Sequence, residues 1–307
     1  MNENLGATQA GDQLRSAVSN ETLIRIDEPL ARRTTLRVGG PADVYVEPAS
    51  ENDLAAVLQI IARLELPILV LGRGSNLLVK DGGFRGVAIC LGHSHWNGIA
   101  VTGRHLQCGA GARLKAVASE ARLHGLSGLE FLEGIPGTVG GGLRMNAGAM
   151  GGAIFEVVES VRVMDFEGRQ WQKSPGEMQV EYRRCGALRT QIALSAVLCG
   201  QPGSREAIAQ RMNEFSRKRW QSQPAAPSAG CIFKNPITIP AGKLIDELGL
   251  KGARVGGASV SPEHGNFIVN DGSATARDVL ELIELIRQRA RSERRIELET
   301  EVEIVGE

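Results

Sequence analysis

The chain has 307 residues, and its 35 basic and 35 acidic side chains balance to a formal net charge of zero. A zero balance argues against a nucleic-acid partner, because a basic excess normally supplies that affinity. No apolar stretch approaches the ~20 residues that a membrane helix needs, and the N-terminus lacks the basic and apolar segments of a signal peptide. We therefore expect a cytoplasmic protein with no membrane partner.

The five cysteines are odd in number and scattered along the chain, and no two form a C-x-x-C pair. This usage argues against a zinc knuckle or a disulfide framework and is typical of a reducing compartment. We therefore predict no metal site.

Composition divides the chain into parts. Residues 1–20 are polar and unpatterned, which predicts a mobile tail. After Gly200 the composition changes. Residues 204–220 predict a basic amphipathic helix, and a connector that contains proline follows over residues 223–230. We predict a tail over residues 1–20, an N-terminal domain over 21–200 that divides near residue 90, and a C-terminal domain over 201–307.

The first elements predict a strand–helix–strand unit. Val44–Glu47 is a predicted strand, Ser50 begins a capping box with Asp53 ahead of an amphipathic helix, and Pro67–Leu71 is a predicted buried strand. In a Rossmann fold the glycine loop after such a strand opens directly into a helix. Here residues 76–83 predict a strand and a turn instead, so the sequence disfavours a Rossmann fold.

Further elements follow along the chain. A helix ending before Gly125 and a helix capped by Thr275 with Asp278 are the clearest of them. The predicted ranges are helices over 113–124 and 276–291 and strands over 157–163, 192–198 and 301–305.

Two glycine-rich stretches are the strongest functional signal. One is Gly72–Asn76, and the other is Gly134–Gly142, which leads into Asn146–Ala149. Glycine lets backbone N–H groups approach a diphosphate closely, so two such loops indicate a dinucleotide held from both sides. Three glycines at 140–142 would cost roughly 1 kcal/mol each in a plain helix. Either an anion at a helix N-terminus or tight helix–sheet packing explains them.

Other segments carry reactive side chains. Cys231 lies three residues before Lys234, which suits a nucleophile or proton donor, although an isolated cysteine is more often inert. Arg183 lies in a basic turn that suits carboxylate or phosphate binding, although most surface arginines bind nothing. His264 is a weaker candidate. Glu301 belongs to an acid-rich end in which alternate residues normally face solvent.

Taken in order, these segments resemble the bacterial UDP-N-acetylenolpyruvoylglucosamine reductase family. The resemblance extends from about residue 34 to the end of the chain. The interval from Arg183 to Lys234 is too short for the substrate-capping insertion of one branch, so the chain resembles the shorter branch. The segments that carry the resemblance are Thr34–Ala42, Gly72–Asn76, Gly134–Gly141, Asn146–Ala149, Tyr182–Arg183, Gly230–Pro236, Ala241–Ile245 and Glu301–Val302.

The resemblance implies an enzyme of peptidoglycan synthesis. The family reduces UDP-N-acetylglucosamine enolpyruvate to UDP-N-acetylmuramate with tightly, non-covalently bound FAD and with NADPH as hydride donor. It implies an α+β protein with an FAD-binding fold of the vanillyl-alcohol oxidase type, in which two α/β subdomains surround FAD, and a C-terminal α+β substrate domain. We expect a monomer whose partners are small molecules.

The resemblance also implies residue roles. The expected FAD contacts are Gly72, Arg73, Gly74, Ser75, Asn76, Gly134, Pro136, Gly137, Thr138, Gly140, Gly141, Asn146, Ala147 and Gly148. The expected substrate contacts are Tyr182, Lys234, Asn235, Lys243 and His264. The expected catalytic residues are Arg183, Cys231 and Glu301.

The chemistry gives each catalytic residue a task. Hydride addition to the vinyl carbon develops enolate-like charge, which Arg183 stabilises and Glu301 assists. Cys231 stands where the family often has a serine, and a thiol with a reference pKa of ~8.5 is the stronger acid, so we expect it to protonate the enolate carbon. Cys185 likewise replaces a frequent serine. Two alternatives are an FAD oxidase of the same fold acting on an alcohol or sugar, and a non-catalytic flavin-binding module.

Overall fold

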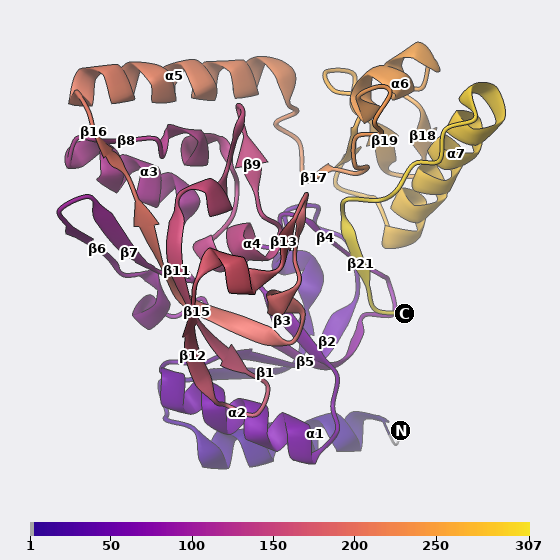
Figure 1. Ribbon diagram of the computed structural model, residues 1–307. Coiled ribbons are helices and arrows are strands. Elements are labelled where there is room, and N and C mark those ends of the chain that lie inside the picture. The colour runs from indigo at the N-terminus through magenta and orange to yellow at the C-terminus, as the bar shows by residue number, and fades with distance from the viewer. Residues whose placement is uncertain (1–2) are drawn as a thin grey trace. The chain divides into compact units, whose positions relative to one another are not determined.

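The computed structural model describes residues 3–307, and of residues 3–5 the backbone alone (Figure 1). The chain divides into two compact units, and each has its own hydrophobic core. Unit 1 comprises Met1–Asp27, Asp43–Arg73 and Gly86–Lys218, and unit 2 comprises Glu28–Ala42, Gly74–Arg85 and Arg219–Glu307.

This division corrects the predicted boundary near residue 200. The chain leaves unit 1 at Lys218, and two early segments join unit 2. The segment Gly74–Arg85 joins unit 2 through a long-range pairing, because β4 (Leu77–Val79) lies parallel to β21 (Glu303–Val305). The boundary lies beyond residue 200 because Ile208 and Met212 are buried in the core of unit 1. Changes in composition along the chain cannot reveal a pairing between such distant strands.

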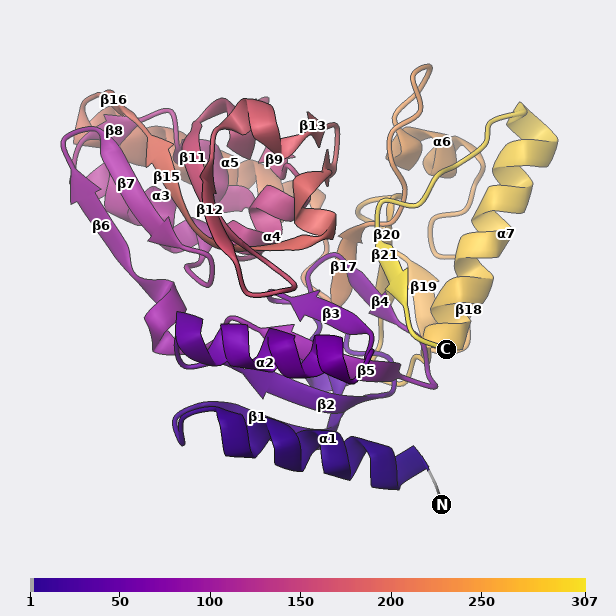
Figure 2. The ribbon, with the colours of Figure 1, turned by 60° about the horizontal axis from the view of Figure 1, so that its bottom comes forward.

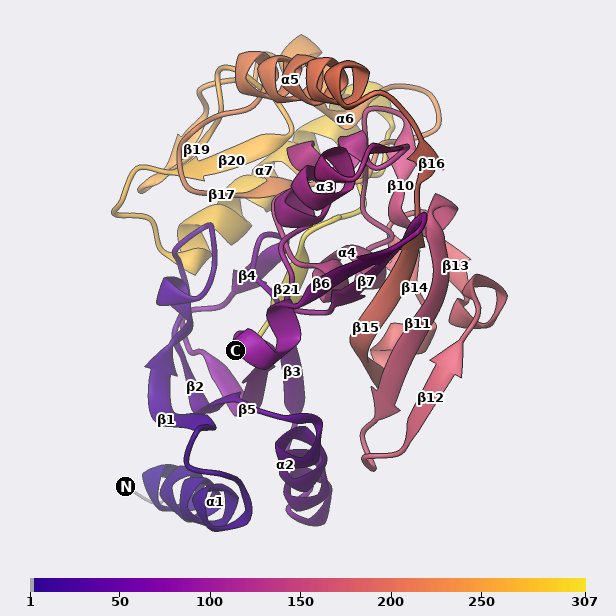
Figure 3. The same cartoon turned by 90° about the vertical axis from the view of Figure 1, so that its left-hand side faces the viewer.

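The predicted mobile tail also needs correction, although residues 1 and 2 lie outside the described part. Glu3–Ala17 form helix α1, which packs against α2 (Glu51–Arg63; Figure 3). Ala7, Ala10 and Leu14 are buried at helical spacing. Two of these three residues are alanines, so the apolar stripe is too weak to distinguish from a polar tail in the sequence.

The first sheet of unit 1 has the strand order β1-β2-β5-β3, and β3 is parallel to β5. The predicted strand–helix–strand unit is present as β2, α2 and β3, but β5 lies between the two strands. Ser50 caps α2 by accepting a hydrogen bond from the Asp53 N–H, as predicted. The strands are β1 (Leu23–Pro29), β2 (Pro41–Glu47), β3 (Ile68–Leu71) and β5 (Phe84–Cys90).

The second sheet of unit 1 is antiparallel and has the order β12-β11-β15-β7-β6. Residue 90, where the sequence suggested a division, is the last residue of β5, and the second sheet begins at Ile99. The strands are β6 (Ile99–Thr102), β7 (His105–Gly109), β11 (Val158–Asp165), β12 (Gln170–Lys173) and β15 (Gln191–Cys199).

Helices α3 and α4 pack against this second sheet. Along the chain, α5 comes after the last strand of the sheet, β15. Gly125, with φ +64°, follows α3 and ends it, as predicted. The helices are α3 (Leu114–Leu123), α4 (Val139–Arg144) and α5 (Arg205–Ser222). The short strands are β8 (Leu126–Ser127), β9 (Gly148–Ala149), β10 (Gly152–Ala153), β13 (Val180–Glu181), β14 (Arg184–Cys185) and β16 (Gln201–Pro202). The 3-10 turns are η2 (Ser94–Asn97), η3 (Glu130–Gly134), η4 (Ile154–Glu156), η5 (Pro175–Met178) and η6 (Ala187–Arg189).

Unit 2 is built on an antiparallel sheet with the order β17-β20-β19-β18 and on the parallel pair β4–β21 (Figure 2). The predicted capping box of Thr275 and Asp278 begins α7. Besides β4 and β21, the elements of unit 2 are η1 (Leu30–Arg32), β17 (Ser228–Cys231), α6 (Ala241–Glu247), β18 (Arg254–Val255), β19 (Ala258–Val260), β20 (Phe267–Asn270) and α7 (Ala276–Arg294). Across the described residues, the helices are all too short or too polar to span a bilayer.

The packing of helix α1 against the rest of unit 1 can be tested by its effect on stability. Leu14→Ala removes a fully buried side chain from the core of unit 1, and we expect it to lower the free energy of unfolding by about 2–5 kcal/mol. Gln9→Ala, at an exposed position of the same helix, should change it by less than about 0.5 kcal/mol. Denaturant unfolding of both variants measures the difference, and equal stabilities would mean that α1 is dispensable for the fold.

Candidate active site

A cavity of about 420 Å³ lies within unit 1. Its walls come from the ends of β3, β5 and β7, from the start of α4 and from the start of β15. The lining residues are Val70, Leu71, Gly72, Arg73, Cys90, Leu91, Gly92, Asn97, Ala110, Gly111, Ala112, Arg113, Ala116, Thr138, Gly140, Gly141, Arg144, Leu188, Gln191, Ile192 and Ala193. We call this the cofactor cavity.

The two predicted glycine loops meet at this cavity. A Cβ atom on Gly72 would lie 2.9 Å from Thr138 Oγ1, closer than side-chain atoms normally approach. Thr138 in turn begins α4, where its Oγ1 accepts a hydrogen bond from the Gly141 N–H. The absence of a side chain at position 72 therefore leaves room for the cap of α4 beside the end of β3.

Tight packing explains two of the three consecutive glycines. A Cβ on Gly140 would lie 3.2 Å from the Ala110 Cβ, and one on Gly142 would lie 3.2 Å from atoms of Leu114 and Ile154. The Gly140 N–H donates to the Ala110 carbonyl at 2.8 Å. These glycines therefore let α4 approach its neighbours, and Gly140 serves the cavity by its small size rather than by a backbone N–H aimed into it.

The charged lining of the cofactor cavity is basic. Arg73, Arg113 and Arg144 are the charged residues among those that line it, and the Arg144 guanidinium donates to the Leu188 carbonyl at 2.6 Å. Guanidinium groups suit a diphosphate, and the remaining wall is largely small or apolar, which suits an aromatic ring system. The cavity therefore fits the chemistry of FAD.

Other predicted FAD residues lie beside the cavity lining rather than in it. Gly134 ends η3, and Asn146, Ala147 and Gly148 follow α4 directly. Pro136 and Gly137 lie in the loop between η3 and α4. Gly74, Ser75 and Asn76 belong to unit 2, where the Asn76 side chain donates to the Glu301 carbonyl at 3.0 Å.

Arg183 lies in a two-residue turn between β13 and β14, because Glu181 pairs with Arg184 across the hairpin. Its backbone has φ +57°, a conformation that costs a non-glycine residue on the order of 1 kcal/mol. The guanidinium lies over the Tyr182 ring, 4.9 Å from the centroid, and donates to the Gly148 carbonyl at 3.4 Å. The turn therefore holds the Arg183 guanidinium beside the segment after α4.

Cys231 and Glu301 lie on adjacent segments of unit 2. The Glu301 N–H donates to the carbonyl of Ile232, the neighbour of Cys231, at 2.8 Å. Gly230, with φ +75°, has space for a Cβ that would lie 3.7 Å from the Ser75 carbonyl oxygen. Within unit 2, the segment of Cys231 therefore lies beside the segment of Glu301 and beside Gly74–Asn76, the second half of the first glycine loop.

The four remaining candidates have partners inside unit 2. Lys234 forms an ion pair with Glu299, and exposed Lys243 lies 3.8 Å from the Glu247 carboxylate. The Asn235 side chain accepts from the N–H of Ala241, the first residue of α6. The pKa of His264 lies below its usual value because burial, and then the charge of Lys251, disfavour protonation.

Comparisons with known proteins decide the family. Residues 223–305 match the family model described as UDP-N-acetylenolpyruvoylglucosamine reductase, C-terminal domain, and residues 42–172 match the FAD binding domain. The UDP-N-acetylenolpyruvoylglucosamine reductase of Clostridioides difficile is 42% identical over 92% of this chain and 94% of its own. The chain belongs to this reductase family. A reductase from Symbiobacterium thermophilum is 43% identical over 96% of both chains.

A solved structure shows the family's fold. The crystal structure of a reductase of this name from Thermus caldophilus matches with a TM-score of 0.80 and 40% identity, covering 93% of this chain and 99% of that one. The predicted family, the α+β fold class with its FAD-binding domain and the FAD cofactor are confirmed.

Several residues that line the cofactor cavity are not predicted by any sequence pattern. Cys90 ends β5 and Leu91 follows it, and Arg144 lies at the end of a six-residue helix. Ala110 and Ala112 gave the one usable signal, because a run of small residues over 110–112 follows β7 directly. Arg113 pairs with Thr138 across an isolated backbone bridge, which no local pattern reveals.

The glycine cradle of this reductase is testable through cofactor retention. Gly72→Ala places a methyl group against Thr138 Oγ1 and disturbs the cap of α4, a cap of a kind worth about 1 kcal/mol. We expect the purified variant to retain less FAD, measured as the ratio of flavin to protein absorbance. Gly176→Ala is the matched control, because its Cβ meets nothing within 4 Å and position 176 is not in the cavity lining. Equal flavin content in both variants would contradict the cradle.

Proposed function

We propose that the protein reduces UDP-N-acetylglucosamine enolpyruvate to UDP-N-acetylmuramate in peptidoglycan synthesis, with NADPH as the source of the hydride. The single observation that carries the proposal is the 42% identity to a reductase of this name over 92% of the chain, which includes both matched domains. We further propose that the protein acts in the cytoplasm as a monomer.

The cofactor cavity is the proposed FAD site. When bound, FAD supplies the hydride that it receives from NADPH. Gly72 and Gly140 let α4 pack closely beside the proposed diphosphate position, and Arg73, Arg113 and Arg144 supply positive charge near it. The segment Asn146–Gly148, which follows α4, is proposed to lie next to the flavin.

Arg183 is proposed to bind the substrate carboxylate. Its planar guanidinium matches a carboxylate, and it stabilises the negative charge that develops on the carboxylate and the adjacent carbon as hydride arrives at the vinyl carbon. The contacts with Tyr182 and Gly148 support this role, because they hold the guanidinium in one place before substrate binds. The positive φ of Arg183 is typical of a strained functional position.

Cys231 is proposed to complete the reduction. Its S–H bond breaks as the proton passes to the enolate carbon, a new C–H bond forms there, and the thiolate later regains a proton from solvent. Glu301 is proposed to assist Arg183 in stabilising the enolate-like charge, and the hydrogen bond from the Glu301 N–H to the Ile232 carbonyl places its segment beside that of Cys231. Both belong to unit 2, whereas Arg183 belongs to unit 1.

The substrate's diphosphate and sugar are proposed to contact Lys234, Lys243 and His264. Lysine Nζ atoms supply charge to the diphosphate, and a neutral His264 can both donate and accept a hydrogen bond. Asn235 is proposed to act on the same site through α6, whose first N–H it caps.

An anaerobic experiment tests the reaction. Addition of NADPH to the purified flavoprotein should bleach the flavin, and UDP-N-acetylglucosamine enolpyruvate should then restore the oxidised spectrum. Bleaching without recovery would mean that the protein uses another acceptor, and a simple alcohol or sugar that bleaches the flavin would identify an oxidase instead.

The proton donor has its own prediction. Cys231→Ala should slow the substrate-dependent recovery about 10²–10⁴-fold, the usual contribution of a general acid, and leave the NADPH-dependent bleaching unchanged. Cys231→Ser keeps a donor and should retain activity. Stopped-flow absorbance separates the two half-reactions. Full recovery in Cys231→Ala would remove the thiol from the mechanism.

A further inference from the structure

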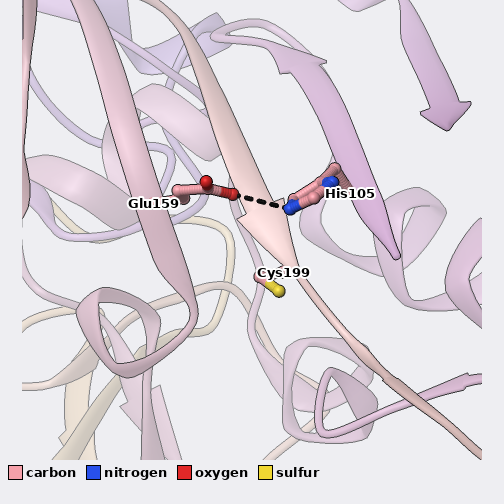
Figure 4. A group of neighbouring side chains, drawn as sticks. All are labelled: His105, Glu159 and Cys199. Atoms are coloured by element: carbon pink, nitrogen blue, oxygen red, sulfur yellow. Dashed lines mark ion pairs between the residues drawn. The ribbon is translucent and has the colours of Figure 1, made fainter. Parts of the chain in front are cut away.

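Three ligand-type side chains gather at one end of the five-stranded sheet (Figure 4). His105 comes from β7, Glu159 from β11 and Cys199 from β15. Their potential ligand atoms all lie within 4.8 Å of one another, and His105 Nε2 lies 2.9 Å from Glu159 Oε2. The proposed reaction uses none of the three.

The strand register places His105 and Cys199 on the same face. Cys199 ends the central strand β15 and pairs directly with His105 of β7. On the other side of β15, the Cys199 N–H donates to the Val157 carbonyl at 2.8 Å. The side chains of His105 and Glu159 are 40% and 55% exposed, while Leu106 and Leu198 beside them point into the core. The cluster is therefore open to an ion from solvent.

A bulge brings Glu159 into the cluster. The register between β11 and β15 shifts between Val158 and Ser160, so Glu159 is the extra residue. Such bulges redirect a side chain that regular pairing would place elsewhere. The backbones of all three strands are hydrogen-bonded at this point, so the strands that carry the three ligands are held together before any ion binds.

We propose that His105, Glu159 and Cys199 bind a divalent transition-metal ion of the zinc class. Imidazole nitrogen, thiolate sulfur and carboxylate oxygen are the three ligand types that zinc takes in proteins, and three of them with a water make a tetrahedral site. With metal–ligand bonds of ~2.0–2.1 Å, the ligand–ligand edge of such a site is about 3.3 Å. The nitrogen and oxygen are 2.9 Å apart and the sulfur lies within 4.8 Å of both, so modest rotations of the three side chains would bring the atoms to this edge.

The proposed metal site is remote from the cofactor cavity along the sheet. Gln191, Ile192 and Ala193, at the start of β15, line the cavity, whereas Cys199 ends the same strand. At ~3.3 Å per residue, Ala193 and Cys199 are separated by about 20 Å. The ion would therefore join β7, β11 and β15 and stabilise this end of the sheet, without a part in the reduction.

Cobalt(II) is the probe for the first test. The FAD-loaded protein is first treated with a chelator and then titrated with Co²⁺ in buffer that contains a phosphine reductant, which keeps the cysteines reduced. Difference spectra are recorded at red wavelengths, beyond the flavin absorption. We expect tetrahedral cobalt bands and a thiolate-to-cobalt band that saturate at one equivalent. Zn²⁺ should abolish these bands by competition and raise the melting temperature of the protein.

Variants separate a metal site from a simple ion pair. Cys199→Ser should abolish the thiolate band, and Cys199→Ser and His105→Ala should each weaken cobalt binding at least about tenfold. His124→Ala is the matched control, because His124 also lies beside a carboxylate, Glu120 at 3.5 Å, but has no thiol partner in the cluster. It should bind cobalt like the wild type.

Two results would overturn the metal site. Absence of the cobalt bands in the wild-type protein would leave His105 and Glu159 as an ion pair only. Bands of unchanged affinity in both Cys199→Ser and His105→Ala would place the ion elsewhere. NADPH-dependent bleaching of the flavin serves as the folding control for every variant.

Discussion

The close approach of α4 to the end of β3 is the constraint on which the cofactor cavity depends. Gly72 has no side chain to meet the Thr138 hydroxyl, and Gly140 has none to meet Ala110. A methyl group at either position would push against its neighbour, so glycine lets the two loops lie close together beside one space. Glycine here lowers the intrinsic stability of a short helix, and packing and the Thr138 cap offset that cost.

Local chemistry explains what the sequence could predict. The capping boxes at Ser50 and Thr275 and the stop at Gly125 involve residues a few positions apart, so their patterns predict the helix ends directly. The ordered motifs predicted the family, and with it the fold class and FAD. Parts of both glycine loops, Gly72–Arg73 and Thr138–Gly141, lie at one cavity of unit 1.

The remaining features depend on contacts between distant residues. Helix α1 is held by burial of Leu14, which two alanines accompany, so no strong periodicity marks it. The proposed metal ligands His105, Glu159 and Cys199 are far apart in sequence and meet only through strand register and a bulge. A search for closely spaced cysteines could not find them. Roles for Arg183, Cys231 and Glu301 came from the family resemblance and remain proposals.

The parallel pairing of β4 with β21 has a consequence for biosynthesis. Leu36 and Leu78, which are fully buried in unit 2, leave the ribosome long before residues 229–302, which supply most of this core, and before β21, which pairs with β4. Translation from residue 77 to residue 303 takes roughly 10–45 s at ~5–20 residues per second. For most of that interval these apolar side chains lack their native neighbours, so the nascent chain exposes apolar surface until its C-terminal part is made.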